Sequence, residues 1–162
     1  MSDLNNKKLM QFFFKDQPID FVDYCIKYKL QTGIYPHLTC LDSADMLQEY
    51  FIQSLSLYIE KKKGFIYIAN HTILKEKNVY KVGFTKKIAS RQKSLNNASV
   101  IGEIIICNYY ECLSAGLTES YIKEKLKPYQ MQEEKEYFKI NYSLLESVIK
   151  ESISYINSLL TF

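Results

Sequence analysis

The chain has 162 residues, of which 47% are hydrophobic and 24% are charged, and its formal net charge is +3. This length accommodates one compact domain with a substantial core, or a small domain that carries an added helical element. No apolar run approaches the roughly 20 residues of a membrane span, and the first residues lack the apolar stretch of a signal peptide. We therefore expect an intracellular protein, in the cytoplasm or nucleus, with no membrane partner.

Cysteine and histidine are too scattered to indicate a metal or disulfide framework. No two of the four cysteines form a CxxC pair, and the two histidines do not stand at matching ligand spacings. The sequence therefore predicts neither a zinc site nor structural disulfides, as is usual in a reducing compartment.

Helical periodicity dominates the first sixty residues. Pro18 suits the first turn of a helix, and the apolar residues after it recur at intervals of three and four. Asp42 and Ser43 are capping residues ahead of a second helix. The three lysines at 61–63 should end that helix, since positive charge is favourable at a helix C-terminus. We expect residues 1–62 to form a helical extension and residues 63–162 to form a separate domain.

From Gly64 the hydrophobic period changes to two, which is typical of strands. Strands are expected over residues 65–69 and 79–84, joined as a hairpin by a turn-rich segment. Thr85 is a candidate cap for a helix that runs to about Leu95.

The remaining elements complete an α+β pattern. We expect a strand over 100–110, a helix over 114–127, a short strand over 137–140 and a terminal helix capped by Asn141. The resulting order of elements is ββαβαβα, after the helical extension.

Strand alternation assigns residues of the hairpin to opposite faces of the sheet. Ile66 and Ile68 belong to the face that forms the core. Tyr67 and Lys81 are expected on the other face, projecting together into a cleft, whereas Tyr80 should pack against the core.

Charge is unevenly distributed along the chain. Residues 61–93 carry ten cations against one acid, a balance of +9, whereas the segments before and after them carry −3 each. Such a basic block indicates an anionic partner, most often the nucleic-acid backbone, although a solvated surface would also explain it. The side chains expected to contact nucleic acid are Lys61, Lys62, Lys63, Lys75, Lys77, Lys86, Lys87, Lys93 and Asn97. The last of these would alternatively cap the preceding helix.

Within the basic block lies Arg91, the only arginine beside twenty lysines. A guanidinium presents a planar fork of donors that can hold a phosphate or carboxylate through two bonds. The alternative is a compositional bias toward lysine, in which case Arg91 is accidental.

Five short motifs carry a resemblance to a known family. Gly64–Ile68, Lys81–Thr85, Arg91, Glu119 and Glu136–Phe138 follow one another as in the GIY-YIG nuclease superfamily. They are most similar to its branch named after a phage T5 open reading frame, in which the second motif reads KIG and an EWF-like triplet follows the glutamate. The resemblance covers residues 64 to about 140, and it implies an α+β fold with a small central antiparallel sheet flanked by helices.

The resemblance implies metal-dependent hydrolysis of a DNA phosphodiester. In that reaction Arg91 would clamp the phosphate, Tyr67 would orient or deprotonate the attacking water, and Glu119 would hold Mg²⁺ or Mn²⁺. Lys81 stands where many relatives have a second tyrosine, so it would contact phosphate, accept the proton or favour ionisation of Tyr67 by its charge. These four residues form the predicted catalytic set.

One feature of the sequence offers an alternative role for Glu119, and another departs from the family pattern. Glu119 and Lys123 stand four residues apart, so they would also form an ordinary surface pair on a helix. Lys123 itself occupies a position where related sequences often have histidine.

Residues Gly33 to Tyr35 spell the first family motif literally, but Pro36 follows and no glycine-bearing partner strand lies within hairpin distance. We interpret this string as a loop between two helices.

Three hypotheses follow for function. The first is a DNA endonuclease, and the second is a catalytically inactive DNA-binding module of the same fold. The third is a protein-interaction module that uses the aromatic residues of the helical extension for a protein partner or a homodimer. Those aromatic residues are Phe12, Phe13, Phe14, Phe21 and Tyr24.

Overall fold

The computed structural model describes residues 18–34, 44–74, 78–99 and 102–161. The chain divides into two compact units, one made of Met1–Lys61 with Leu159–Phe162 and the other of Lys62–Ser158. None of the described helices is long and apolar enough to cross a bilayer.

The first unit contains helix α2 (Pro18–Thr32) and most of helix α3 (Ala44–Lys62). Pro18 opens α2 as predicted, because proline lacks only an amide proton that the first turn does not use. Phe21 is buried in this unit whereas Tyr24 is 40% exposed, and the other three aromatic residues of the protein-interaction hypothesis lie outside the described residues.

The string that begins at Gly33 is not part of a strand. Gly33 has φ +81°, and its amide donates to the carbonyl of Lys29 at 2.8 Å, which is the geometry of a glycine that ends a helix. Gly33 and Ile34 therefore follow α2 as a turn, while Tyr35 lies outside the described residues.

The second unit is built on a four-stranded sheet. Its strands are β1 (Gly64–His71), β2 (Val79–Thr85), β3 (Ile104–Cys112) and β4 (Tyr137–Lys139). They are arranged in the order β3-β1-β2-β4, with all neighbours antiparallel. The expected α+β fold with a small antiparallel sheet is confirmed, although β3 begins and ends later than predicted.

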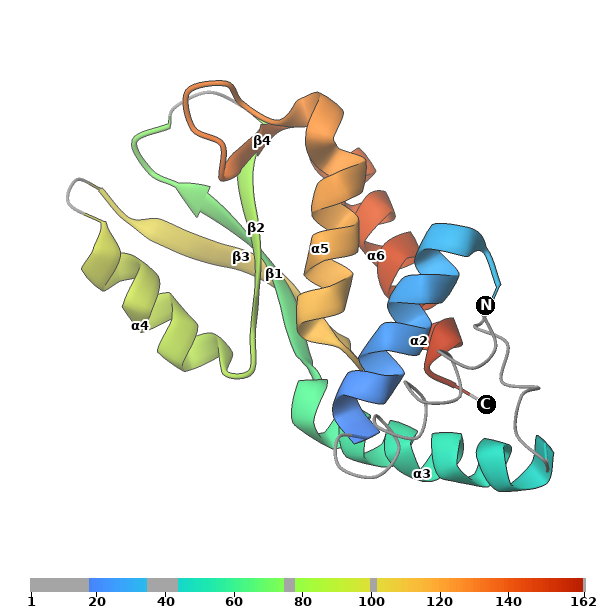
Figure 1. The fold of residues 1–162 in the computed structure, drawn as a ribbon. Helices are drawn as coiled ribbons and strands as arrows, with labels where there is room; N and C mark the ends of the chain where they lie inside the picture. The colour runs from blue at the N-terminus through green and yellow to red at the C-terminus, as the bar shows by residue number, and fades with distance from the viewer. Residues whose placement is uncertain (1–17, 35–43, 75–77, 100–101, 162) are drawn as a thin grey trace. The chain divides into compact units, whose positions relative to one another are not determined.

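Helices cover both faces of this sheet (Figure 1). Helix α5 (Ala115–Leu126) and helix α6 (Tyr142–Leu159) lie on one face, and helix α4 (Ile88–Ala98) lies on the other. The α5 and α6 side forms the larger core, around the buried residues Ile66, Ile68, Val82, Ile122, Leu126, Phe138, Leu145 and Ile149. Tyr80 packs against this cluster as predicted, whereas Tyr67 and Leu95 are buried in the smaller cluster under α4.

The helix ends follow from local capping, with one correction. The Oδ1 of Asn141 accepts hydrogen bonds from the amides of Ser143 at 2.9 Å and Leu144 at 3.3 Å, which confirms it as the cap of α6. The prediction that Thr85 caps α4 is wrong. Its hydroxyl bonds to the backbone of Lys87 in the turn that precedes the helix, and α4 begins at Ile88.

Gly83 allows a close approach between the two central strands. It faces Tyr67 in the β1–β2 register, and a Cβ atom at this position would lie 2.5 Å from Cζ of the Tyr67 ring. No side-chain carbon tolerates that distance, so only glycine lets the tyrosine ring lie flat across β2. Gly64, the glycine of the first motif, has a similar constraint, because a Cβ atom there would lie 2.8 Å from the carbonyl oxygen of Thr85.

Replacing Gly83 by alanine should therefore destabilise the sheet. We expect Gly83→Ala to lower the free energy of unfolding by about 1–3 kcal/mol, the usual range for overpacking a filled core, as measured by chemical denaturation. Gly116→Ala is the matched control. Its Cβ would lie 3.8 Å from the Phe84 ring, an ordinary contact, so this helical substitution should be neutral or stabilising by up to about 1 kcal/mol. Equal effects from the two variants would contradict the close-approach argument.

Candidate functional site

The four side chains of the predicted catalytic set line one small cavity. Tyr67 comes from β1, Lys81 from β2, Arg91 from α4 and Glu119 from α5. The cavity has a volume of about 110 Å³, comparable to roughly four water molecules at about 30 Å³ each. It can surround a phosphate-sized group but is too small for a nucleoside.

Tyr67 forms the floor of this cavity and is more enclosed than the sequence predicts. Its side chain is 0% exposed. The ring approaches β2 at Gly83, and α4 packs over it through Leu95. Its hydroxyl oxygen accepts a hydrogen bond from Nε of Arg91 at 3.0 Å, and the guanidinium carbon lies 5.7 Å from the ring centroid. The tyrosine therefore fixes the position of the guanidinium.

Arg91 is also positioned through its helix. Nε2 of Gln92 donates a hydrogen bond to the carbonyl of Ile104 at 2.6 Å, and Oε1 of Gln92 accepts one from the amide of Ile106 at 2.7 Å. These two bonds tie α4 to β3. Leu95 anchors the next turn in the smaller core. Since Tyr67 engages only Nε, the two terminal amino groups carry the donors that a phosphate contact requires.

Lys81 is held by a partner that sequence reasoning missed. Its ammonium forms an ion pair with the carboxylate of Glu136, and Nζ lies 5.8 Å from the centroid of the Tyr137 ring. Lys81 is paired with Tyr137 across β2 and β4, so the residue just before β4 reaches the lysine. The sequence marks Glu136 as part of a motif, but its role depends on a strand pairing that no local pattern reveals.

Glu119 faces the cavity together with Lys123. The two form the expected ion pair one helical turn apart, with the Glu119 side chain 14% exposed and that of Lys123 43% exposed. Both residues line the cavity. The helix pair therefore exists, and it lies inside the candidate site.

The electrostatic balance of the cavity favours an anion. Three cations, Lys81, Arg91 and Lys123, line it beside two carboxylates, Glu119 and Glu136. The Lys81 ammonium holds the pKa of Glu136 below its ordinary value of 4.5, through a hydrogen bond and charge attraction. Glu136 therefore carries its charge at neutral pH, and by residue type the lining has one more cation than it has carboxylates.

The donor set is compatible with a hard divalent cation that takes few ligands from the protein. The described residues contain no group of three histidine, cysteine or acidic side chains placed to hold an ion. Mg²⁺ often binds through one or two carboxylates and completes its shell with water and substrate phosphate. Glu119, with Glu136 on the same cavity, supplies that number of carboxylates.

None of the described residues predicted to contact nucleic acid is part of the cavity lining. Those that the structure describes are exposed, namely Lys61, Lys62, Lys63, Lys86, Lys87, Lys93 and Asn97. Lys75 and Lys77 lie outside the described residues. Asn97 lies inside the last turn of α4 and the residue that ends this helix is Ser99, so capping by Asn97 is not observed.

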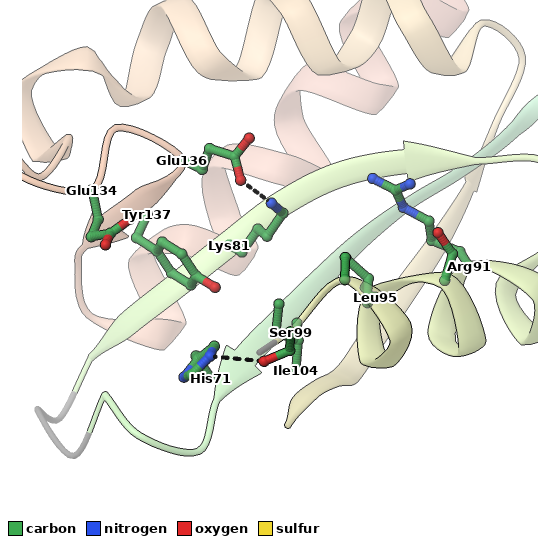
Figure 2. A pocket seen from close by; sticks show the side chains of 11 residues that line it. His71, Lys81, Arg91, Leu95, Ser99, Ile104, Glu134, Glu136 and Tyr137 are labelled. Carbon is green, nitrogen blue, oxygen red and sulfur yellow. Dashed lines mark hydrogen bonds and ion pairs between the residues drawn. The ribbon is translucent and has the colours of Figure 1, made fainter. Parts of the chain in front are cut away.

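A larger groove adjoins the small cavity and shares Lys81, Arg91 and Glu136 with it. Its volume is about 560 Å³. Figure 2 shows Arg91 at one end, His71 and Ser99 toward the other, and Lys81 between them. No local sequence pattern indicates this groove, because its wall combines the end of β1, one face of α4 and the start of β4.

The Lys81–Glu136 contact predicts a measurable titration. In the parent chain the Glu136 carboxyl should titrate below pH 4.5, and in Lys81→Met its pKa should rise toward that value because the attracting charge is gone. Carboxyl-carbon NMR would measure both. Lys93→Met is the control. It removes an exposed lysine of α4 that does not line the cavity, so it should leave the pKa of Glu136 unchanged.

The same contact predicts a small dependence of stability on pH. Because the folded-state pKa lies below the unfolded one, the stabilisation is present above about pH 4.5 and is lost as the pH falls through the folded value. The Glu136 side chain is 71% exposed, so the difference between the parent and Lys81→Met should stay below about 1 kcal/mol.

Comparison with known proteins relates the sequence of this chain to a viral protein and to a domain family. The chain is 28% identical over 109 residues to the KilA-N domain-containing protein 315L of Invertebrate iridescent virus 6. The match covers 62% of this chain and 46% of the viral protein, so the chain spans less than half the length of that relative. No solved structure matches the chain significantly.

The family model of the T5orf172 domain matches residues 64–153, which is more than half of the chain and contains every residue of the small cavity. This match agrees with the branch that the five sequence motifs indicate. The chain therefore belongs to the T5orf172 domain family.

Proposed function

We propose that the protein is a metal-dependent DNA endonuclease that hydrolyses phosphodiester bonds. The observation that carries the proposal is the convergence of Tyr67, Lys81, Arg91 and Glu119 from four separate elements on one phosphate-sized cavity. The +9 segment that contains Tyr67, Lys81 and Arg91 and the family membership support DNA as the partner, since a basic block attracts the phosphate backbone.

Arg91 and Lys81 bind the scissile phosphate in this mechanism. The Tyr67 hydroxyl and the helix hold Arg91 with its terminal amino groups available for two parallel bonds to phosphate oxygens. Lys81 is held by Glu136 at the cavity and donates to a phosphate oxygen. Preorganised donors of this kind stabilise the charge that accumulates on phosphoryl oxygens in the transition state.

Tyr67 orients the attacking water. Its oxygen accepts from Arg91, which leaves its own proton and second lone pair to engage a water molecule in the cavity. The enclosure of the ring fixes this hydroxyl next to the bound phosphate, so the water is held close to the phosphorus atom.

Glu119 is the residue that would hold the cation, with Glu136 within the same cavity. A bound Mg²⁺ or Mn²⁺ would polarise a phosphoryl oxygen and stabilise the leaving oxygen. Lys123 forms an ion pair with Glu119 and would have to release the carboxylate for Glu119 to hold the cation.

Cleavage of supercoiled plasmid tests the proposal. We expect nicking or linearisation with Mg²⁺ or Mn²⁺ and none with chelator. Glu119→Ala should abolish cleavage while DNA binding changes less than about threefold, because the loss of one carboxylate does not weaken attraction to DNA. Glu124→Ala, an exposed glutamate of the same helix, is the matched control and should cleave like the parent. Full cleavage by Glu119→Ala would show that the assigned site is wrong.

Arg91→Lys tests the phosphate clamp separately. The change keeps the charge but removes the planar fork and the bond from Nε to Tyr67. We expect the cleavage rate to fall by about 10²–10³, as when a transition-state donor is lost, while the free energy of unfolding changes by about 1 kcal/mol. Single-turnover kinetics and denaturant unfolding measure the two effects. Lys93→Arg should change neither the cleavage rate nor the free energy of unfolding. Unchanged turnover in Arg91→Lys would show that the single arginine reflects only the compositional bias toward lysine.

A catalytically inactive DNA-binding module is the second candidate function. The observation that favours it is that two members of the catalytic set, Lys81 and Glu119, are each engaged in an ion pair. This candidate predicts binding that weakens steeply with salt, as lysines displace counterions from phosphates, and no cleavage with either cation.

A further inference from the structure

The groove beside the phosphate-sized cavity has the size and lining of a ligand site. Its volume of about 560 Å³ falls within the range of about 300–1,000 Å³ that is usual for small-molecule sites. The buried side chains Leu95 and Ile104 form an apolar wall, and Tyr137 adds an aromatic ring. The groove therefore offers a surface for a flat, largely apolar group.

Charge differs between the two ends of the groove. Arg91 and Lys81 are shared with the phosphate-sized cavity, whereas Glu134 and the hydroxyl of Ser99 line other parts of the groove. An acidic wall disfavours a second phosphate, so the groove suits a ligand with one phosphate at the Arg91 end and an uncharged remainder.

His71 lies toward the far end of the groove and is fixed there by hydrogen bonds. Its Nδ1 accepts a hydrogen bond from the amide of Ile73 at 3.2 Å, and its Nε2 lies 3.4 Å from Oγ of Ser99. Ser99 in turn donates to the carbonyl of Gly102 at 2.9 Å. This chain of bonds ties the end of β1 to the end of α4.

We propose that this groove binds the nucleoside of an unpaired nucleotide of DNA, next to the phosphate that Lys81 and Arg91 hold. The inference rests on the proposed function, because it requires a DNA phosphate in the smaller cavity. That cavity has no room for a nucleoside, and the shared residues join it directly to the groove. A base that is paired and stacked in a duplex cannot enter such a groove, so the nucleotide is single-stranded or turned out of the helix.

Ala98 allows the groove to be filled without changing the phosphate site. It is exposed and lines the groove, on the same face of α4 as Arg91, Ser94 and Leu95. Ala89 is also exposed but lies on the opposite face of the helix, since nine residues correspond to two and a half turns. Ala98→Trp and Ala89→Trp are therefore a matched pair of variants.

The test measures binding of single-stranded DNA in chelator, so no cleavage is required. The probes are a labelled oligonucleotide of mixed sequence and a strand of equal length made only of abasic sites, both followed by fluorescence anisotropy. The parent should bind the normal strand about tenfold more tightly, as expected when one base contacts a protein site. In Ala98→Trp this ratio should fall close to one with the affinity for the abasic strand unchanged, whereas Ala89→Trp should keep the tenfold ratio.

Other outcomes would overturn the proposal. Equal binding of both strands by the parent, or an equal loss of both in Ala98→Trp, would show that no base enters the groove. Deoxycytidine monophosphate that binds as tightly as the strand would assign the groove to free nucleotides instead of DNA. Methyl NMR of Leu95 and Ile104 in the parent gives an independent reading, because the normal strand should shift these signals and the abasic strand should not.

The two proposals can fail separately. A chain that prefers the normal strand but cuts no plasmid keeps the groove assignment and loses the endonuclease. A chain that cuts plasmid but binds both strands alike keeps the endonuclease and loses the groove.

Discussion

The contact of the Tyr67 ring with Gly83 is the constraint on which the candidate site depends. A ring at this place requires a strand partner without a side chain, and the glycine in the β1–β2 register supplies it. The enclosed hydroxyl then has a fixed position, in which its oxygen accepts a hydrogen bond from Nε of Arg91. The guanidinium is thereby oriented without any help from a ligand.

The remaining charges of the cavity come from β2, from the residue before β4 and from α5. Strand pairing sets Lys81 opposite Tyr137 and within reach of Glu136, and α5 carries Glu119 and Lys123 to the edge of the same cavity. The Lys81–Glu136 pair joins distant parts of the chain and the Glu119–Lys123 pair lies within one helix. Both fix their side chains in place, although exposed pairs contribute little to stability. Their value here lies in position, since a phosphate must meet several donors at once.

The two cavities divide the tasks that a strand-cleaving protein would need. The small one is lined by charges and matches a phosphate, whereas the groove combines an apolar wall with a few polar groups and matches a nucleoside. The face of α4 that carries Arg91 also carries Ser94, Leu95 and Ala98, because these residues recur at helical intervals. One helix thus lines both cavities.

The sequence by itself determined the elements of the second unit and their α+β order, because hydrophobic periodicity and turn residues are local properties. The catalytic candidates came from the resemblance of five short motifs to a known family. The sequence also placed Tyr67 and Lys81 on one face, since side chains alternate along a strand. Tertiary structure alone decided that Glu136 holds Lys81, that α4 covers Tyr67, and that a groove opens beside the phosphate-sized cavity. These features depend on strand order and helix packing, which join residues far apart in the chain and leave no periodic signal in the sequence.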